Sequence, residues 1–155
     1  MSTIKDEWTV AMEDVARALH GTIAVLGRVQ KSIEDTLLDA DVLADAPQQH
    51  EQALNQLEAM IRSHGELPDD YDPEQDLARD ALASLRESFA TSGTVEILRE
   101  AEEAEEALVA ATAEALSLEE LGPESEELLA GLGRLAVETG SDLARLRLAA
   151  ILTWA

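Results

Sequence analysis

The chain has 155 residues, the size of one domain, and we expect residues 1–155 to form a single domain. It carries 33 acidic against 11 basic residues, which gives a formal net charge of −22. So negative a chain repels nucleic acid and anionic membrane surfaces, and it attracts cations or basic proteins. We therefore expect neither nucleic acid nor a membrane as a partner, and a basic protein is a candidate partner.

Cysteine is absent, which excludes disulfides, thiolate metal sites and cysteine nucleophiles. The first residues, MSTIKDEW, lack the basic and apolar segments of a signal peptide. No apolar run approaches the roughly 20 residues that are needed to span a bilayer. We therefore expect a cytoplasmic protein.

Apolar residues recur every three or four positions, and no alternating strand pattern occurs, so the sequence predicts helices. The first helix is expected from about Glu7 to about Leu38. Its apolar stripe comprises Met12, Val15, Leu19, Ile23, Leu26, Val29, Ile33 and Leu37. A second helix follows, with Asp45 as its N-cap, Pro47 in its first turn and Gly65 as its C-terminal stop.

Beyond Gly65, the segment ELPDDYDPEQ is rich in turn residues, and its Asp-Pro pair predicts a short helix over about 72–89. A Glu-rich helix is expected over about 95–116, and a last helix, opened by a proline, over 123–154. The stripe of the Glu-rich helix comprises Ile97, Ala101, Ala104, Leu108, Ala111 and Ala115. The chain thus predicts an all-α fold of four long helices and one short helix.

The connection from Gly65 to Gly93 is far longer than two adjacent antiparallel helices need. A short helix of about 16 residues covers about 24 Å, which is close to the length of the second helix. The connection can therefore carry the chain back along the whole bundle. The second and third long helices would then be parallel, as in bundles of the ferritin-like group.

The segment ILREAEEAEEALVAATAEAL, at 97–116, resembles the third bundle helix of an uncharacterised bacterial four-helix family in the ferritin-like group. That family tends to have an Ile-Leu-x-x-Ala-Glu-x-Gly-Glu pattern there, followed by an Ala-rich tail; this chain has Ala104 at the Gly position. The preceding ALASLRESF is similar too, and the resemblance extends over about residues 45–148. It implies a ferritin-like four-helix bundle with one long crossover that carries a short extra helix.

The ferritin-like metal site takes one Glu from each of two helices and a Glu-x-x-His from each of the other two. No Glu-x-x-His occurs here, since the residues three before the histidines are Arg17, Pro47 and Ile61. Thr22 stands where an inward Glu is expected, and Ser141 stands near the expected position of a His. We therefore expect the di-iron site to be lost, and no cofactor.

Four carboxylates remain as candidate ligands for iron or manganese, with calcium as a further option for a cluster of Glu105, Glu138 and Asp142: Glu102, Glu105, Glu138 and Asp142. Of these, Glu102 and Glu105 match the paired Glu of the family. Glu105 shares a helix line with Ala101 and could face the core. We expect instead that it flanks the apolar stripe in water, and that Glu138 and Asp142 pair with nearby arginines on the surface.

Two histidines, His50 and His64, fall on the apolar line of the second helix, near its two ends. They are about 21 Å apart along the helix and cannot share one ion. We expect both at the edge of the core, with His64 as a cation at the helix C-terminus.

The chain ends carry apolar residues without an evident partner, Trp8 at one end and LRLAAILTWA at the other, which favours a homodimer. The leading hypothesis is therefore a non-catalytic structural or protein-interaction module. The alternative is an iron- or manganese-binding protein in iron handling or oxidative stress. A third hypothesis, which rests on net charge alone, is an acidic antagonist of a basic partner.

Overall fold

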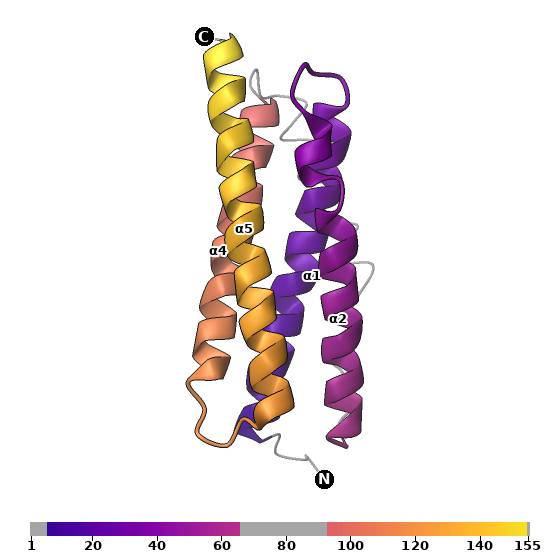
Figure 1. Ribbon diagram of the computed structural model, residues 1–155, viewed down its shortest axis with the longest axis vertical. Coiled ribbons are helices and arrows are strands. Elements are labelled where there is room, and N and C mark those ends of the chain that lie inside the picture. The colour runs from indigo at the N-terminus through magenta and orange to yellow at the C-terminus, as the bar shows by residue number, and fades with distance from the viewer. Residues whose placement is uncertain (1–5, 66–92, 155) are drawn as a thin grey trace.

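The structure is a computed structural model that describes residues 6–65 and 93–154. All regular elements of these residues are helical: α1 (Glu7–Ile33), a 3-10 turn η1 (Ala40–Leu43), α2 (Ala46–Ser63), α4 (Gly93–Leu116) and α5 (Pro123–Trp154). Four long helices lie side by side (Figure 1). The expected all-α, four-helix architecture is confirmed, and the short helix expected over 72–89 lies outside the described residues.

The first helix begins as expected but ends at Ile33, five residues before the predicted boundary. Asp6 caps its start by accepting a hydrogen bond from the Thr9 N–H at 2.7 Å. At the other end, the Thr36 hydroxyl donates to the Ile33 carbonyl at 2.8 Å and so offers this carbonyl a partner outside the helix. Leu37, which the stripe placed in the core, is 96% exposed.

The bounds of α2 agree with the sequence at both ends, although one expected cap does not form. Pro47 lies in the first turn, and Asp45 occupies the N-cap position without a side-chain capping hydrogen bond, so its expected capping role is wrong. Gly65 follows the helix at a φ of 91°, a conformation that is strained for other residues. Gly65 is therefore the C-terminal stop that the sequence predicted.

The directions of the helices follow from pairs of residues that touch. The hydroxyls of Ser32 and Thr94 are 2.8 Å apart, and Thr22 donates to the Ala104 carbonyl at 3.3 Å, so α1 and α4 are antiparallel. Asp6, beside α1, contacts His64 at the end of α2, so α1 and α2 are antiparallel too. The second and third long helices consequently run in the same direction (Figure 1), as predicted from the length of the connection.

The buried apolar side chains form two clusters, one in each half of the bundle. One cluster includes Met12, Val15, Leu19, Leu54, Leu57, Ile61, Leu108, Leu129 and Leu132. The other includes Leu26, Val29, Ile33, Leu43, Ile97, Leu98, Ala101, Leu143 and Leu146. Each long helix contributes to both clusters, so each helix crosses from one apolar region to the other at mid-height.

None of the helices in the described part of the chain combines the length and apolar character that crossing a membrane requires.

Candidate functional site

A layer of polar residues separates the two apolar clusters. Each long helix supplies one buried polar residue between its contributions to the two clusters: Thr22, His50, Glu105 and Thr139. On α4, for example, Glu105 is preceded by Ala101 of one cluster and followed by Leu108 of the other. The four helices therefore bring polar groups together at the height where the hydrophobic core is interrupted.

Within this layer His50 and Glu105 form a buried contact. The His50 Nε2 and Glu105 Oε1 atoms are 2.8 Å apart, and the two side chains are 0% and 1% exposed. The other ring nitrogen, Nδ1, lies 2.6 Å from the Ala46 carbonyl, one turn earlier on α2. A carbonyl can only accept, so we assign the Nδ1 proton to this bond.

This assignment fixes how many protons the pair shares. With Nδ1 protonated, the short Nε2–Oε1 contact needs one further proton, carried either by the imidazole or by the carboxyl group. The 2.8 Å separation is within hydrogen-bond range, but the contact lacks the full geometry of a hydrogen bond. Nε2 and both Glu105 oxygens consequently have no well-aligned hydrogen-bond partner among the described residues.

Burial dominates the electrostatics of Glu105. Removal of water from the carboxylate raises the pKa of Glu105, and the interaction with His50 lowers this pKa by less than burial raises it. Glu105 lies in the middle of α4, where no free backbone N–H is available to stabilise a negative charge. Burial therefore disfavours the charged form of the Glu105 carboxyl group, and His50 offsets only part of this effect.

The structure corrects the expected position of both residues. Glu105 does not flank the apolar stripe in water, and His50 does not lie at the edge of the core. The buried line of α4 passes through Glu105 and Thr112, where the sequence favoured their neighbours Ala104 and Ala111. On α2 the buried residues are Ala46, His50, Leu54, Leu57 and Ile61, in steps of four and three.

The four candidate carboxylates do not converge. Glu102 pairs with Arg147 of α5, Asp142 with Arg145 at 2.6 Å as expected, and Glu138 is exposed. Only Glu105 is buried. Across residues 6–65 and 93–154, no group of three or more His, Asp or Glu side chains is placed to hold a metal ion.

On α5 the buried polar residue of this layer is Thr139, whereas Ser141, which the sequence placed near a missing ligand, is exposed. Two residues along a helix turn a side chain by about 200°, so the resemblance placed this position on the wrong face. The adjacent Gly140 brings α5 close to α4, since a Cβ there would lie 3.7 Å from the Glu105 Cβ. The periodicity of α5 around Ala136 and Leu143 could have identified Thr139 as the inward residue.

The other histidine of α2, His64, lies at the end of the bundle, where the N-terminus of α1 meets the C-terminus of α2. Its Nε2 is 2.9 Å from Asp6 Oδ2, and its ring stacks on Trp8 with centroids 4.0 Å apart. Trp8 also donates to the Ser125 hydroxyl at 3.2 Å. The expectation that Trp8 lacks a partner within the chain is therefore wrong.

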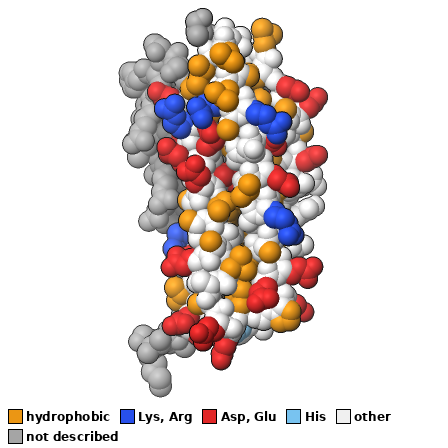
Figure 2. Space-filling view, turned by 60° about the vertical axis from the view of Figure 1, so that its left-hand side comes forward, with side chains coloured by type: hydrophobic (Ala, Val, Ile, Leu, Met, Phe, Trp, Pro, Cys, Tyr) orange, Lys and Arg blue, Asp and Glu red, His pale blue; other side chains and the backbone are white. Residues whose placement is uncertain are grey.

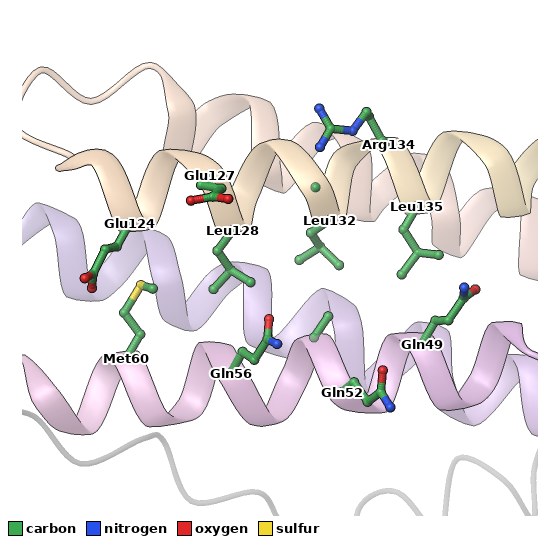
Figure 3. A pocket seen from close by; sticks show the side chains of 12 residues that line it. Gln49, Gln52, Gln56, Met60, Glu124, Glu127, Leu128, Leu132, Arg134 and Leu135 are labelled. Carbon is green, nitrogen blue, oxygen red and sulfur yellow. The ribbon is translucent and has the colours of Figure 1, made fainter.

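A groove of about 570 Å³ separates α2 from α5 (Figure 3). Leu128, Leu132 and Leu135 point from α5 toward α2. Its remaining lining residues include Gln49, Gln52, Gln56, Met60, Glu124, Glu127 and Arg134. The groove thus has an apolar wall on α5 and a largely amide-bearing wall on α2.

Comparison of the chain with protein-family models, with curated proteins and with solved structures gives no match.

Proposed function

We propose that the protein is a non-catalytic bundle of ferritin-like topology that acts in the cytoplasm as a structural or protein-interaction module and forms a homodimer. The observation that carries this proposal is the outer face of α5. Four large hydrophobic side chains are exposed there: Val137, Leu148, Ile151 and Leu152. Exposed apolar side chains that gather on one helix are typical of interaction surfaces.

The arrangement of the helices supports the ferritin-like part of the proposal. α2 and α4 run in the same direction and are joined by one long connection, which is the topology of ferritin-like bundles. Two of the four candidate carboxylates form ion pairs with arginines, since Glu102 contacts Arg147 and Asp142 contacts Arg145. This dispersal favours a bundle without the four-helix metal centre of that group.

Light scattering coupled to size-exclusion chromatography tests the homodimer. We expect a mass of twice the chain mass of 16.7 kDa at high protein concentration, with dissociation on dilution. A mass of one chain at every concentration would contradict the homodimer.

One observation favours the alternative, an iron- or manganese-binding protein. A carboxylate oxygen, Oε2 of Glu105, is buried beside an imidazole without a hydrogen-bond partner among the described residues. Imidazole and carboxylate are ligands that both metals accept. Elemental analysis of protein purified without chelator tests this alternative, which predicts stoichiometric iron or manganese that is lost in Glu105→Ala.

A further inference from the structure

The exposed face of α5 is a continuous strip that points away from the core. Val137, Ser141, Ala144, Leu148 and Leu152 follow one another in steps of four, three, four and four. Such steps place them on one line of the helix, about 22 Å long. The core residues of α5 occupy the opposite line: Leu132, Ala136, Thr139, Leu143, Leu146 and Ala150.

The strip has the size and chemistry of a helix-packing surface. Val137, Leu148 and Leu152 are 59%, 53% and 79% exposed, and the small residues Ser141 and Ala144 lie between them. Small residues at the centre allow a second helix to approach closely, and large ones at the ends supply apolar contact. Figure 2 shows hydrophobic side chains interspersed with basic and acidic side chains on one face of the molecule.

The charge of this part of α5 differs from that of the chain. Residues 128–154 contain three arginines and two acids, so their net charge is 3 − 2 = +1, against −22 for the whole chain. Two copies of so acidic a protein repel each other over most of their surface. The strip is therefore a place where like-charge repulsion between two copies is weaker than over the rest of their surface.

Two of the charged residues beside the strip can pair with each other across a twofold axis, and Arg145 also contacts Asp142 of its own chain at 2.6 Å. Glu138 and Arg145 are seven residues apart, two turns of the same edge of α5. In an antiparallel pair of α5 helices whose twofold axis passes between Ser141 and Asp142, each Glu138 lies opposite Arg145 of the second copy, because 138 + 145 equals 141 + 142. In a parallel pair this edge of α5 would instead face the opposite edge of the second helix, and Glu138 and Arg145 would not meet.

We propose, on the basis of the homodimer suggested above, that two copies of this chain associate through their α5 strips in antiparallel orientation, with Ser141 near the twofold axis and two Glu138–Arg145 pairs across the interface. Val137 of each copy then packs between Ala144 and Leu148 of the other. A single pair of helices buries less than a typical stable interface. We therefore expect the dimer to dissociate on dilution.

Single cysteines give the sharpest test, because the natural chain has none. Under mild oxidation Ser141→Cys forms a disulfide-linked dimer, since the two residues are offset by about 1.5 Å along the helices. Leu152→Cys does not, because the two residues are about 31 Å apart along antiparallel helices. Linkage of both variants would show a parallel pair, and linkage of neither would show that α5 is not the interface; either result overturns the proposal.

Charge reversal tests the register independently. Glu138→Arg and Arg145→Glu each place like charges opposite one another twice, and we expect each to raise the dimer dissociation constant about tenfold. The double variant restores both pairs and returns the dissociation constant to near the value of the natural chain. Failure of this rescue in a protein that still dimerises would overturn the register and leave the homodimer standing.

A matched pair of leucine variants tests the strip as a whole. Leu148→Glu, in the strip, is expected to raise the dissociation constant by about tenfold or more, because it buries a charge in the interface. Leu37→Glu makes the same change at a residue that is 96% exposed and outside the strip, and it should leave the constant unchanged. Circular dichroism confirms that both variants are folded. Equal dissociation constants for the two variants would overturn the proposal.

Discussion

Of the three histidine–carboxylate pairs between helices among residues 6–65 and 93–154, two have nearly the same distance, yet the pKa values of their carboxyl groups shift in opposite directions. His50 Nε2 lies 2.8 Å from Glu105, and His64 Nε2 lies 2.9 Å from Asp6. Burial raises the pKa of Glu105, whereas the hydrogen bond from His64 is the main cause that lowers the pKa of Asp6 to about 2. The chemistry of the partners is the same, so their surroundings decide the sign.

The two carboxyl groups differ in their exposure to water and in whether a backbone N–H donates a hydrogen bond to them. The Glu105 side chain is 1% exposed and lies in mid-helix, whereas the Asp6 side chain is 56% exposed and accepts the Thr9 N–H at the start of α1. Desolvation disfavours a charged carboxylate, and a donated N–H at a helix N-terminus favours it. A histidine partner alone therefore does not determine the charge state of a carboxyl group.

The largest expected effect comes from removal of the buried imidazole. His50→Ala leaves Glu105 in the core without its partner, and we expect the free energy of unfolding to fall by about 3–5 kcal/mol. Urea denaturation at neutral pH measures this change. His64→Ala is the matched control at the exposed pair and should have a much smaller effect; equal losses would show that burial does not separate the two pairs.

Removal of both members of the buried pair should reverse most of that loss. His50→Leu combined with Glu105→Leu extends the apolar core through the polar layer, and such replacements are often neutral or stabilising. We expect the double variant to unfold within about 1–2 kcal/mol of the natural chain, with a coupling between the two sites in a double-mutant cycle. Additive losses from the two single Leu variants would argue against a coupled pair.

The raised pKa of Glu105 predicts that the free energy of unfolding depends on pH. Replacement of the carboxyl group by the amide in Glu105→Gln should remove this dependence. A carboxyl group whose pKa is higher in the folded than in the unfolded state stabilises the fold below the unfolded pKa of about 4.5, and this contribution is lost as the pH rises through the folded value. The free energy of unfolding of the natural chain should therefore fall relative to Glu105→Gln as the pH rises above about 4.5. Urea denaturation from pH 4 to about 8 checks the difference, and a constant difference would contradict a raised pKa.

The sequence predicts those features of the molecule that local signals determine. Pro123 and Gly65 mark helix ends by backbone chemistry, and both act as expected. The end of α1 was predicted too late, because Thr36 competes for a helix carbonyl through its side chain, a contact that apolar spacing does not reveal. The parallel direction of α2 and α4 was predictable because a long connection has a physical reach.

The buried pair could be predicted only in part. The sequence places Glu105 on the line of Ala101 and Thr112, and it places His50 on the line of Leu54 and Leu57. Each residue alone is more simply read as an edge position, since a lone buried charge is unfavourable. What makes burial tolerable is that the two residues meet, and they are 55 positions apart on different helices (105 − 50 = 55). Such a meeting depends on the rotation of both helices, which no single stripe determines.

At the exposed pair of Asp6 and His64, we expect the free energy of unfolding to depend on pH less strongly than at Glu105 and in the opposite direction. Asp6→Asn keeps a side chain that can cap α1 but removes the charge that pairs with His64. A lowered pKa stabilises the fold above the unfolded value of 3.8, and this contribution is lost as the pH falls through about 2. The natural chain should thus be more stable than Asp6→Asn at pH 5, and this advantage should disappear toward pH 2, as followed by urea denaturation at each pH. An advantage that persists at pH 2 would assign the effect to the cap.

The smallest expected effect is a difference between the two pairs in how the melting temperatures of their variants respond to salt. The melting temperature of the natural chain should rise with NaCl, because screening relieves the self-repulsion of a chain with a net charge of −22. Against this common rise, the effect of Asp6→Asn should shrink as salt screens the exposed pair, whereas the effect of His50→Ala should stay constant because buried charges are screened much less. Calorimetry of both variants and the natural chain between low and high NaCl measures the two differences. If both shrank in parallel, salt would have to reach the His50–Glu105 contact, and the polar layer would be open to solvent at mid-height.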